Sequence, residues 1–274
     1  MRYKYSIISS IVALTIFLFS PTPGFASLLG FADSFAVLGS STVTNTGSSV
    51  VTGDLGVNPG SAITGFPPGI VNGTIYGPGG LSLQAWNDAT SAWTGLQNMP
   101  FTINLTGQDL GNRTLTSGIY HFDSSAQLTG PLTLDAQGLN NAFWNFQIGS
   151  TLTTASSSSV ALINPGSNNG VFWQVGSSAT LGTGTSFLGN ILADQSVTLT
   201  TNADIVCGRT FALNGAVTLD TNDISANCAS RGFSGGLDID ENGNVAPVVP
   251  EPATLSLLGL GLMGLLRFKK NKIA

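Results

Sequence analysis

A repeat of about twenty residues constrains the fold of this chain more than any other feature. A unit of the form apolar-x-Gly-x-apolar occurs four times along the sequence. Its glycines are Gly53, Gly73, Gly189 and Gly208. The first two are 20 residues apart and the last two 19 apart, and rows rich in threonine and serine, such as "VTLTTNAD" at Val197, follow the same rhythm. Self-similarity with this period is typical of solenoids, in which stacked repeats bury a shared core.

The length of the period and the character of its pieces predict three strands in each turn. Pieces of about six residues between Gly, Asn or Pro corners match the usual length of a β-strand. Apolar residues alternate along each piece, as in Val171, Trp173 and Val175, so one side of each strand points inward. A β-sandwich would instead carry hairpin signals every 8 to 12 residues. We therefore expect an all-β solenoid of triangular section.

One segment, at about residues 81–99, departs from the β rhythm. Its apolar residues Trp86, Ala89, Trp93 and Leu96 recur at spacings of 3, 4 and 3. This spacing predicts an amphipathic α-helix that ends before Pro100. We expect the two tryptophans to pack against one flank of the solenoid rather than to form a platform for a sugar.

Both ends of the chain carry export signals. Residues 1–26 contain basic residues, an apolar run and a small-residue exit, which is the pattern of a secretory signal peptide. Residues 250–274 begin with Pro250-Glu251-Pro252, continue with an apolar segment at 253–266 and end in a basic tail. This tail resembles the PEP-CTERM sorting signal of Gram-negative bacteria. The resemblance implies a transient inner-membrane anchor and processing by an exosortase-type machinery at the cell envelope; an ordinary tail anchor is the alternative.

The exported part comprises a predicted solenoid domain at residues 27–230 and an acidic, glycine-containing linker at 231–249. Together they hold thirteen acidic and three basic side chains. This balance excludes nucleic acid as a partner, because binding to phosphates requires a basic surface. Only 8% of the whole chain is charged, far below the usual quarter, while 42% is hydrophobic, which indicates a packed core rather than disorder.

The two cysteines, Cys207 and Cys228, predict a disulfide, because an exported chain meets an oxidising compartment. Closing a loop of this size would stabilise the fold by about 3 kcal/mol. Free thiols are the alternative. A zinc-type site would need further ligands, and His121 is the single histidine of the chain.

Longer motifs carry a more specific signal. They include "FAVLGSSTVTNTGSSVVTGDLGV" at Phe35, "LTGQDLGNRTLTSGIYHFDSS" at Leu105 and "NGAVTLDTN" at Asn214. With the helix, these motifs resemble the bacterial and fungal ice-binding proteins of the DUF3494 family over about residues 28–225. The resemblance implies a right-handed, discontinuous β-helix with one long α-helix packed alongside. It also implies that the chain adsorbs to ice and inhibits ice growth or recrystallisation.

The family resemblance further implies that short Thr-Ala/Gly-x-Thr/Asn rows on a flat face contact ice. The matching rows predict the contact residues Thr46, Ser48, Thr154, Ser156, Thr183, Thr185, Thr201 and Thr221. Asp204 would place a charge on or beside this face, which lowers the expected activity because a carboxylate keeps its own hydration water. A shift of one residue in a strand would turn every named threonine inward.

Threonine rows have a physical rationale and a plainer alternative. Stacked strands repeat at about 4.8 Å and alternate residues along a strand at about 6.6–6.8 Å, which is of the order of oxygen spacings on ice planes. Each threonine adds a methyl group and a hydroxyl group on a side chain with a stiff χ1 angle. Such rows also occur in solenoids simply because threonine suits exposed strands.

Catalysis and metal binding have little support in the sequence. His121 is expected to be an ordinary strand residue, and Asp220 and Asp223 have no cleft across which to face each other. We therefore expect no enzyme and no cofactor. Asp238, Asp240 and Asn242 match the start of a calcium loop, but Val249 stands where the final glutamate would be. An acidic spacer is the preferred interpretation of these residues.

Three functional hypotheses follow, of which the third is a purely structural surface solenoid that binds neither ice nor polysaccharide. The first is an exported, monomeric ice-binding protein whose partners are the ice surface and the sorting machinery. The second is a cell-surface or matrix adhesin that binds extracellular polysaccharide. Adsorption to ice would distinguish them.

Overall fold

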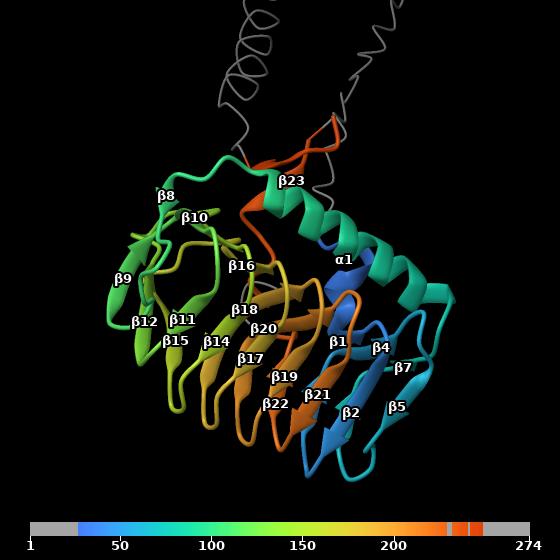
Figure 1. Ribbon diagram of the computed structural model, residues 1–274. Helices are drawn as coiled ribbons and strands as arrows, with labels where there is room; N and C mark the ends of the chain where they lie inside the picture. The colour runs from blue at the N-terminus through green and yellow to red at the C-terminus, as the bar shows by residue number, and fades with distance from the viewer. Residues whose placement is uncertain (1–26, 229–231, 241, 249–274) are drawn as a thin grey trace, which may run out of the picture.

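The computed structural model describes residues 27–228, 232–240 and 242–248. The predicted signal peptide, the Pro250-Glu251-Pro252 motif and the apolar segment at 253–266 lie outside these residues. Within them, parallel strands wind into a right-handed β-helix with three faces and one long α-helix alongside (Figure 1). The expected fold class is confirmed.

The three faces are named here by what they carry. The helix face, over which α1 (Gly80–Asn98) lies, consists in spatial order of β8 (Ile103–Asn104), β10 (Gly118–Phe122), β13 (Phe143–Ile148), β16 (Gly170–Val175), β18 (Ser186–Ala193), β20 (Asp204–Ala212), β1 (Phe35–Gly39), β4 (Asp54–Val57) and β7 (Ile75–Tyr76). The threonine face consists of β11 (Ala126–Leu128), β14 (Leu152–Thr154), β17 (Ala179–Leu181), β19 (Val197–Leu199), β21 (Val217–Asp220), β2 (Thr42–Thr46) and β5 (Ala62–Thr64). The acidic face consists of β9 (Arg113–Thr116), β12 (Pro131–Asp135), β15 (Ser159–Ile163), the first residues of β18 and β20, β22 (Asp223–Ser225), β3 (Val50–Thr52) and β6 (Ile70–Asn72).

The stack is not continuous in sequence. Strands β1–β7 build one end, α1 then carries the chain to the other end, and β8–β22 stack back until β20, β21 and β22 pair with β1, β2 and β3. The 19 residues of α1 span about 28 Å, and nine stacked strands span about 38 Å. The helix and its two flanking loops therefore suffice to return the chain along the whole solenoid.

The glycine repeat marks one corner of the triangle, where the chain passes from the acidic face to the helix face. Gly53, Gly189 and Gly208 have φ values of 130°, 107° and 143°, which disfavour any other residue. A Cβ atom on Gly208 would lie 2.0 Å from the carbonyl oxygen of Gly189 in the next turn. Close stacking of backbone at this corner therefore explains the period that the sequence displays.

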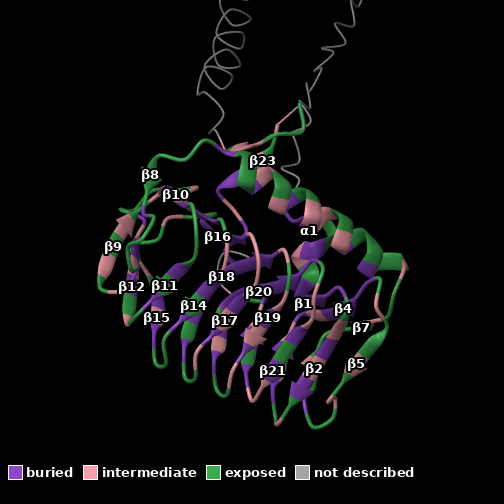
Figure 2. Ribbon diagram, in the orientation of Figure 1, coloured by how far each residue is buried: buried purple, intermediate pink, exposed green. Residues whose placement is uncertain are grey.

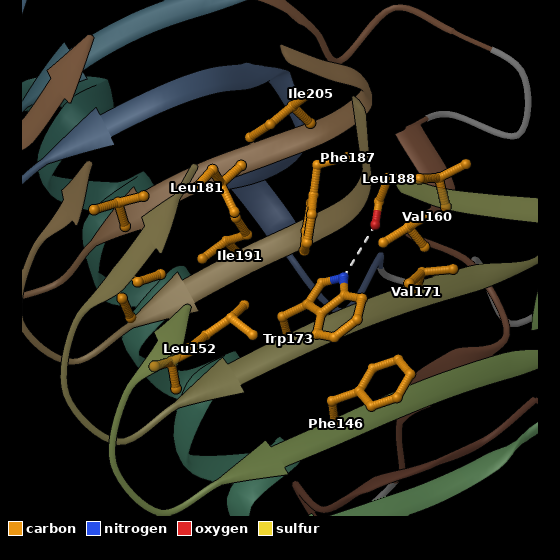
Figure 3. Close-up of a cluster of buried hydrophobic side chains, with 14 of the residues drawn as sticks. Phe146, Leu152, Val160, Val171, Trp173, Leu181, Phe187, Leu188, Ile191 and Ile205 are labelled. Carbon is orange, nitrogen blue, oxygen red and sulfur yellow. Dashed lines mark hydrogen bonds between the residues drawn. The ribbon is translucent and has the colours of Figure 1, made fainter. Parts of the chain in front are cut away.

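Aromatic side chains fill the interior. Phe146 and Trp173 stack with ring centroids 4.0 Å apart, and Phe187 extends the column at 4.9 Å from Trp173 (Figure 3). Tyr120 continues it on the other side, with its ring centroid 5.4 Å from that of Phe146. The indole N–H of Trp173 donates to the carbonyl of Leu188 at 3.0 Å, so its polar atom is satisfied inside the core. The inner sides of the strands are buried through the middle of the stack, while strands at its two ends, such as β5 and β8, are partly or fully exposed (Figure 2).

Helix α1 covers the helix face, as its spacing predicts. Small residues Ala85, Ala89 and Ala92 are buried and permit close approach, while the indole N–H groups of Trp86 and Trp93 donate to the carbonyls of Leu213 and Val175 at 2.8 and 3.1 Å. Both tryptophans therefore pack on the solenoid, as expected, instead of forming a platform.

The C-terminus of α1 is capped by strand β13. The amide of Gln147 donates to the carbonyls of Leu96 and Met99 at 2.8 and 2.7 Å, and Asn145 donates to Leu96 at 2.9 Å. These bonds satisfy helix carbonyls that have no partner within the helix.

The segment expected to be a linker is structured where it is described. Strands β23 (Leu237–Ile239) and β24 (Val245–Pro247) form an antiparallel hairpin that packs on α1, with Leu237 buried and Val245 against Gly95. This segment is structured, although a linker was expected, because its apolar residues pack on the helix.

The expected disulfide between Cys207 and Cys228 is confirmed, with Cα atoms 5.7 Å apart. No helix among the described residues is long and apolar enough to cross a membrane.

Candidate functional site

A column of threonines runs along the centre of the threonine face. Strand pairing places one outward residue of each strand opposite the next, in a single register. The column is Gln127, Thr153, Thr180, Thr198, Thr218, Thr44 and Thr64. The apolar neighbours of five of the threonines, such as Val197 and Leu199 around Thr198, are buried, and Ile63 beside Thr64 is partly buried. Six threonines are therefore presented at the spacing between stacked strands, about 4.8 Å.

Hydroxyl side chains also flank this column. Hydroxyl residues two positions before the column residue of a strand are Ser125, Thr151, Ser178, Ser196 and Thr42. Those two positions after the column residue are Thr129, Thr200 and Thr46. Thr151 donates to Ser125 at 2.8 Å, and the hydroxyl groups of Thr183 and Thr200 are 3.4 Å apart. Contacts between neighbouring turns thus order the hydroxyl groups into a regular array.

The hydroxyl array continues where β2, from the N-terminal part of the chain, pairs with β21, from the C-terminal part. Thr44 donates to Thr218 at 3.5 Å, although the two residues are 174 positions apart. The N-terminal strands β2 and β5 therefore extend a surface that the C-terminal strands begin.

Two carboxylates stand at the margins of the threonine face: Asp109, which forms a parallel bridge with Gln127 beyond the end of the central column, and Asp220 at the edge. Asp220 pairs in register with Thr46 and accepts hydrogen bonds from the hydroxyl groups of Thr201 and Thr221. Asp204, which was expected on or beside the ice-contacting face, begins β20 on the acidic face, where its carboxylate accepts the backbone N–H of Asp223 at 2.8 Å. Burial, and secondarily the charge of Asp223, raise the pKa of the Asp204 carboxyl above its usual value.

Two of the predicted contact residues cannot reach a surface. Thr154 and Thr185 are 3% and 1% exposed, and their hydroxyl oxygens are 2.8 Å apart inside the solenoid. The prediction for these two residues is wrong. In β14 the outward residue is Thr153, one position before the predicted contact residue Thr154, whose side chain points inward. Thr185 lies in the corner after β17, where its hydroxyl group donates to the carbonyl of Ala155 in the neighbouring coil at 3.3 Å.

The other six predicted residues line a corner rather than a face. Thr46 ends β2 at the edge of the threonine face. Ser48, Ser156, Thr183, Thr201 and Thr221 lie in or beside the turns that lead to the acidic face. These turns need a left-handed residue, with φ of 82° at Gly47, 69° at Gly184 and 55° at Asn202. The second residue of these three rows therefore serves the turn, and in the last row Thr221 itself is left-handed, with a φ of 56°.

The central column was missed by reasoning from the sequence. The signal that could have found it is the alternation apolar-Thr-apolar, as in Val197-Thr198-Leu199, which predicts an outward threonine between two inward side chains.

The candidate metal and catalytic residues have structural roles. Asp240 accepts the backbone N–H groups of Asn242 and Asn244 at 2.9 and 2.8 Å, which closes the turn of the hairpin and lowers the pKa of its carboxyl. The described residues contain no group of three metal-binding side chains. His121 contacts Asp123 at 2.9 Å and stacks on Phe101, as a strand residue at a coil edge.

Comparisons with known proteins agree with this architecture. A family model described as Ice-binding-like matches residues 37–225, and a model of the PEP-CTERM protein-sorting motif matches residues 248–270. An ice-binding protein of Nostoc sp. (strain HG1) is 52% identical over 274 residues, which cover 98% of this chain and 97% of that protein.

Solved structures of similar proteins share the fold. The crystal structure of an ice-binding protein from the Antarctic ascomycete Antarctomyces psychrotrophicus has a TM-score of 0.69 at 40% identity, covering 73% of this chain and 98% of that one. An ice-binding protein from an Antarctic biological consortium has a TM-score of 0.69 at 42% identity, covering 72% and 89%. The chain therefore belongs to the ice-binding-like family and carries a PEP-CTERM sorting motif near its C-terminus.

Proposed function

We propose that this chain is an exported protein that adsorbs to ice through its threonine face and so inhibits ice growth and recrystallisation. The observation that carries the proposal is the in-register column of six threonines on the face that α1 leaves uncovered. The names of its relatives point to the same activity.

The threonine face suits an ordered layer of water. Each methyl group forces neighbouring water into a cage, and each hydroxyl group anchors that cage by a hydrogen bond. β-branching restricts χ1, so little side-chain entropy is lost when the surface meets a lattice. Water held in this way acts as part of the binding surface.

The remaining features of the proposal concern export and assembly. The sorting motif supports export and processing by an exosortase-type machinery at the cell envelope. Binding to ice needs no cofactor and converts no substrate, and one copy of the face suffices, so the chain acts as a monomer without enzymatic activity.

Ice-affinity retention tests the proposal. The protein should concentrate in a slowly grown ice phase and keep crystals small in a splat-cooled sample. Thr180→Tyr should abolish both effects, because a bulky ring lifts the surface off the lattice. The matched control is Thr133→Tyr, a half-buried threonine of β12 on the acidic face, which should retain them.

Two results would contradict the proposal. Crystals that coarsen as fast as in buffer would exclude an effect on recrystallisation. Retention on extracellular polysaccharide without affinity for ice would favour the adhesin instead.

A further inference from the structure

A groove of about 540 Å³ lies between the C-terminal half of α1 and the turn of the hairpin that β23 and β24 form; it is called the hairpin groove here. Residues within 90–100 line one wall and residues 243–245 line the other. Figure 1 shows the hairpin beside this end of α1. The volume falls within the range of about 300–1,000 Å³ that is usual for small-molecule sites. No residue of the threonine face lines the groove, so it is a second surface of the molecule.

Close packing holds the two walls together. A Cβ atom on Gly95 of α1 would collide with the side chain of Val245, so the hairpin can approach the helix this closely only at a glycine. Asp240 closes the turn of the hairpin by accepting the backbone N–H groups of Asn242 and Asn244 at 2.9 and 2.8 Å. The fold itself therefore forms the groove.

The α1 wall offers hydrogen-bond acceptors. The hydroxyl groups of Thr90, Ser91 and Thr94 donate to the backbone carbonyls of the residues four positions earlier, at 2.8, 2.9 and 3.0 Å. Each O–H is thereby used within the helix, while the hydroxyl oxygen keeps lone pairs that can accept. The exposed side chain of Asn98 adds an amide group to the same wall. A ligand rich in O–H donors fits this wall better than one rich in acceptors.

The hairpin groove is uncharged and partly apolar. No ionisable side chain lines it, so it offers neither a cation to a phosphate or carboxylate nor a carboxylate to a metal ion. Met99, Pro100 and Val245 supply apolar surface, and Asn244 supplies an amide group on the hairpin wall. A purely apolar ligand would leave the hydroxyl and amide groups without partners, which is unfavourable. These properties favour a neutral molecule that has both hydroxyl groups and apolar C–H faces.

An unsatisfied polar atom lies beside the groove. Asn145 of β13 is fully buried, and its amide nitrogen donates to the carbonyl of Leu96 at 2.9 Å and contacts the sulfur of Met99 at 3.6 Å. Its Oδ1 atom is buried and has no hydrogen-bond partner among the described residues. Met99 lines the groove, and methionine side chains adapt readily, so a shift of Met99 gives a ligand hydroxyl access to this acceptor. Such a bond would satisfy an atom whose burial without a partner is costly.

We infer that the hairpin groove binds a neutral oligosaccharide. Sugar hydroxyl groups donate to the hydroxyl oxygens of α1, and the C–H faces of the rings pack on Met99, Pro100 and Val245. No aromatic ring lines the groove, so the hydrogen bonds carry most of the recognition. Residues 27–249 hold thirteen acidic and three basic side chains, and this charge disfavours an acidic glycan. The inference goes beyond adsorption to ice and does not depend on it.

Isothermal titration calorimetry of the full chain tests the binding directly. The neutral probes are maltotetraose, cellotetraose and laminaritetraose, and the acidic comparison is tetragalacturonate. We expect at least one neutral probe to bind at least about tenfold more tightly than the acidic one.

Variants of α1 locate the site. Thr94→Tyr places a ring in the groove and should weaken binding of the neutral probe at least about tenfold. Thr94→Val keeps the shape of the side chain but removes the acceptor, and should weaken binding about threefold. Asn87→Tyr is the matched control, because Asn87 is exposed on α1 but does not line the groove, and it should leave binding unchanged. All three variants should keep their retention in ice, since the threonine face is untouched.

The inference would be overturned if no neutral probe bound at about 10 mM, or if the acidic probe bound as tightly as the neutral ones. Equal losses in Thr94→Tyr and Asn87→Tyr would also overturn it. Retention in ice separates this inference from the proposed function. A chain that is retained in ice but binds no neutral probe overturns this inference alone, whereas one that binds a neutral probe without retention in ice supports it and overturns the proposed function.

Discussion

The threonine face and the acidic face are built on the same backbone plan but present different surfaces to water. Both are parallel sheets of one solenoid, and both carry outward threonines. On the threonine face the strand pairs keep one register, and the central column is uncharged. On the acidic face Asp135, Asp204 and Asp223 stand at the surface, and Val206 is 49% exposed where the register between β18 and β20 shifts.

A β-solenoid therefore does not by itself make an ice-contacting surface. Three properties must coincide on one face: a repeating hydroxyl side chain, a constant register and the absence of charge from its centre. The acidic face has repeating hydroxyl side chains only in part. A change in one of these properties should therefore affect ice binding on the threonine face and not on the acidic face.

The largest effect on ice retention is expected from a charge in the centre of the threonine face. Thr198→Asp should lower ice retention by at least about tenfold, equivalent to about 1.4 kcal/mol, because the carboxylate would have to give up hydration water to fit a lattice. Thr133→Asp on the acidic face is the matched control and should change retention little. Equal losses in the two variants would mean that the two faces are not distinct in function.

A buried hydroxyl should affect stability rather than ice binding. Thr154→Ala removes the partner of Thr185 and the acceptor for the N–H of Gly182. We expect the free energy of unfolding to fall by about 1–3 kcal/mol in urea titrations, while the folded variant binds ice as the unchanged protein does. Loss of ice binding at unchanged stability would restore Thr154 as a contact residue.

Removal of the edge charge should improve the threonine face slightly. Asp220→Asn keeps an acceptor for Thr201 but removes the carboxylate, so we expect ice retention to rise by about twofold. Asp223→Asn, on the acidic face, provides the comparison and should leave retention unchanged. A decrease with Asp220→Asn would show that the carboxylate takes part in contact with ice.

The smallest effect is a pH-dependent change in stability on the acidic face. Because the pKa of Asp204 is raised in the folded state, its ionisation opposes folding as the pH rises through that pKa. Asp204→Asn should therefore match the unchanged protein in thermal unfolding near pH 3 and be more stable at pH 7. A variant that is less stable at pH 7 would contradict the burial argument.

The sequence predicts the solenoid because stacking leaves a periodic trace in it. The corner glycines, exemplified by Gly189 and Gly208, recur where backbone from successive turns comes too close for a side chain. The helix was predictable for a similar reason, since one buried stripe requires a spacing of 3 and 4.

The contact face was harder to predict because neighbouring residues of a strand point in opposite directions. In the run Thr153-Thr154 composition gives no indication of which threonine faces water, and only the apolar neighbour at Leu152 fixes the direction. The composition of residues 231–249 predicts a spacer because of its carboxylates, whereas Leu237 and Val245 decide how the hairpin in this segment packs.

The most direct test of the central claim is a tyrosine scan of both faces in one ice-affinity assay. The variants on the threonine face are Thr153→Tyr, Thr180→Tyr, Thr198→Tyr and Thr218→Tyr, and those on the acidic face are Thr114→Tyr and Thr133→Tyr. Circular dichroism confirms that each variant is folded before its retention in ice is measured. We predict that every variant of the threonine face loses retention and that both variants of the acidic face keep it; loss on the acidic face with retention on the threonine face would contradict the account.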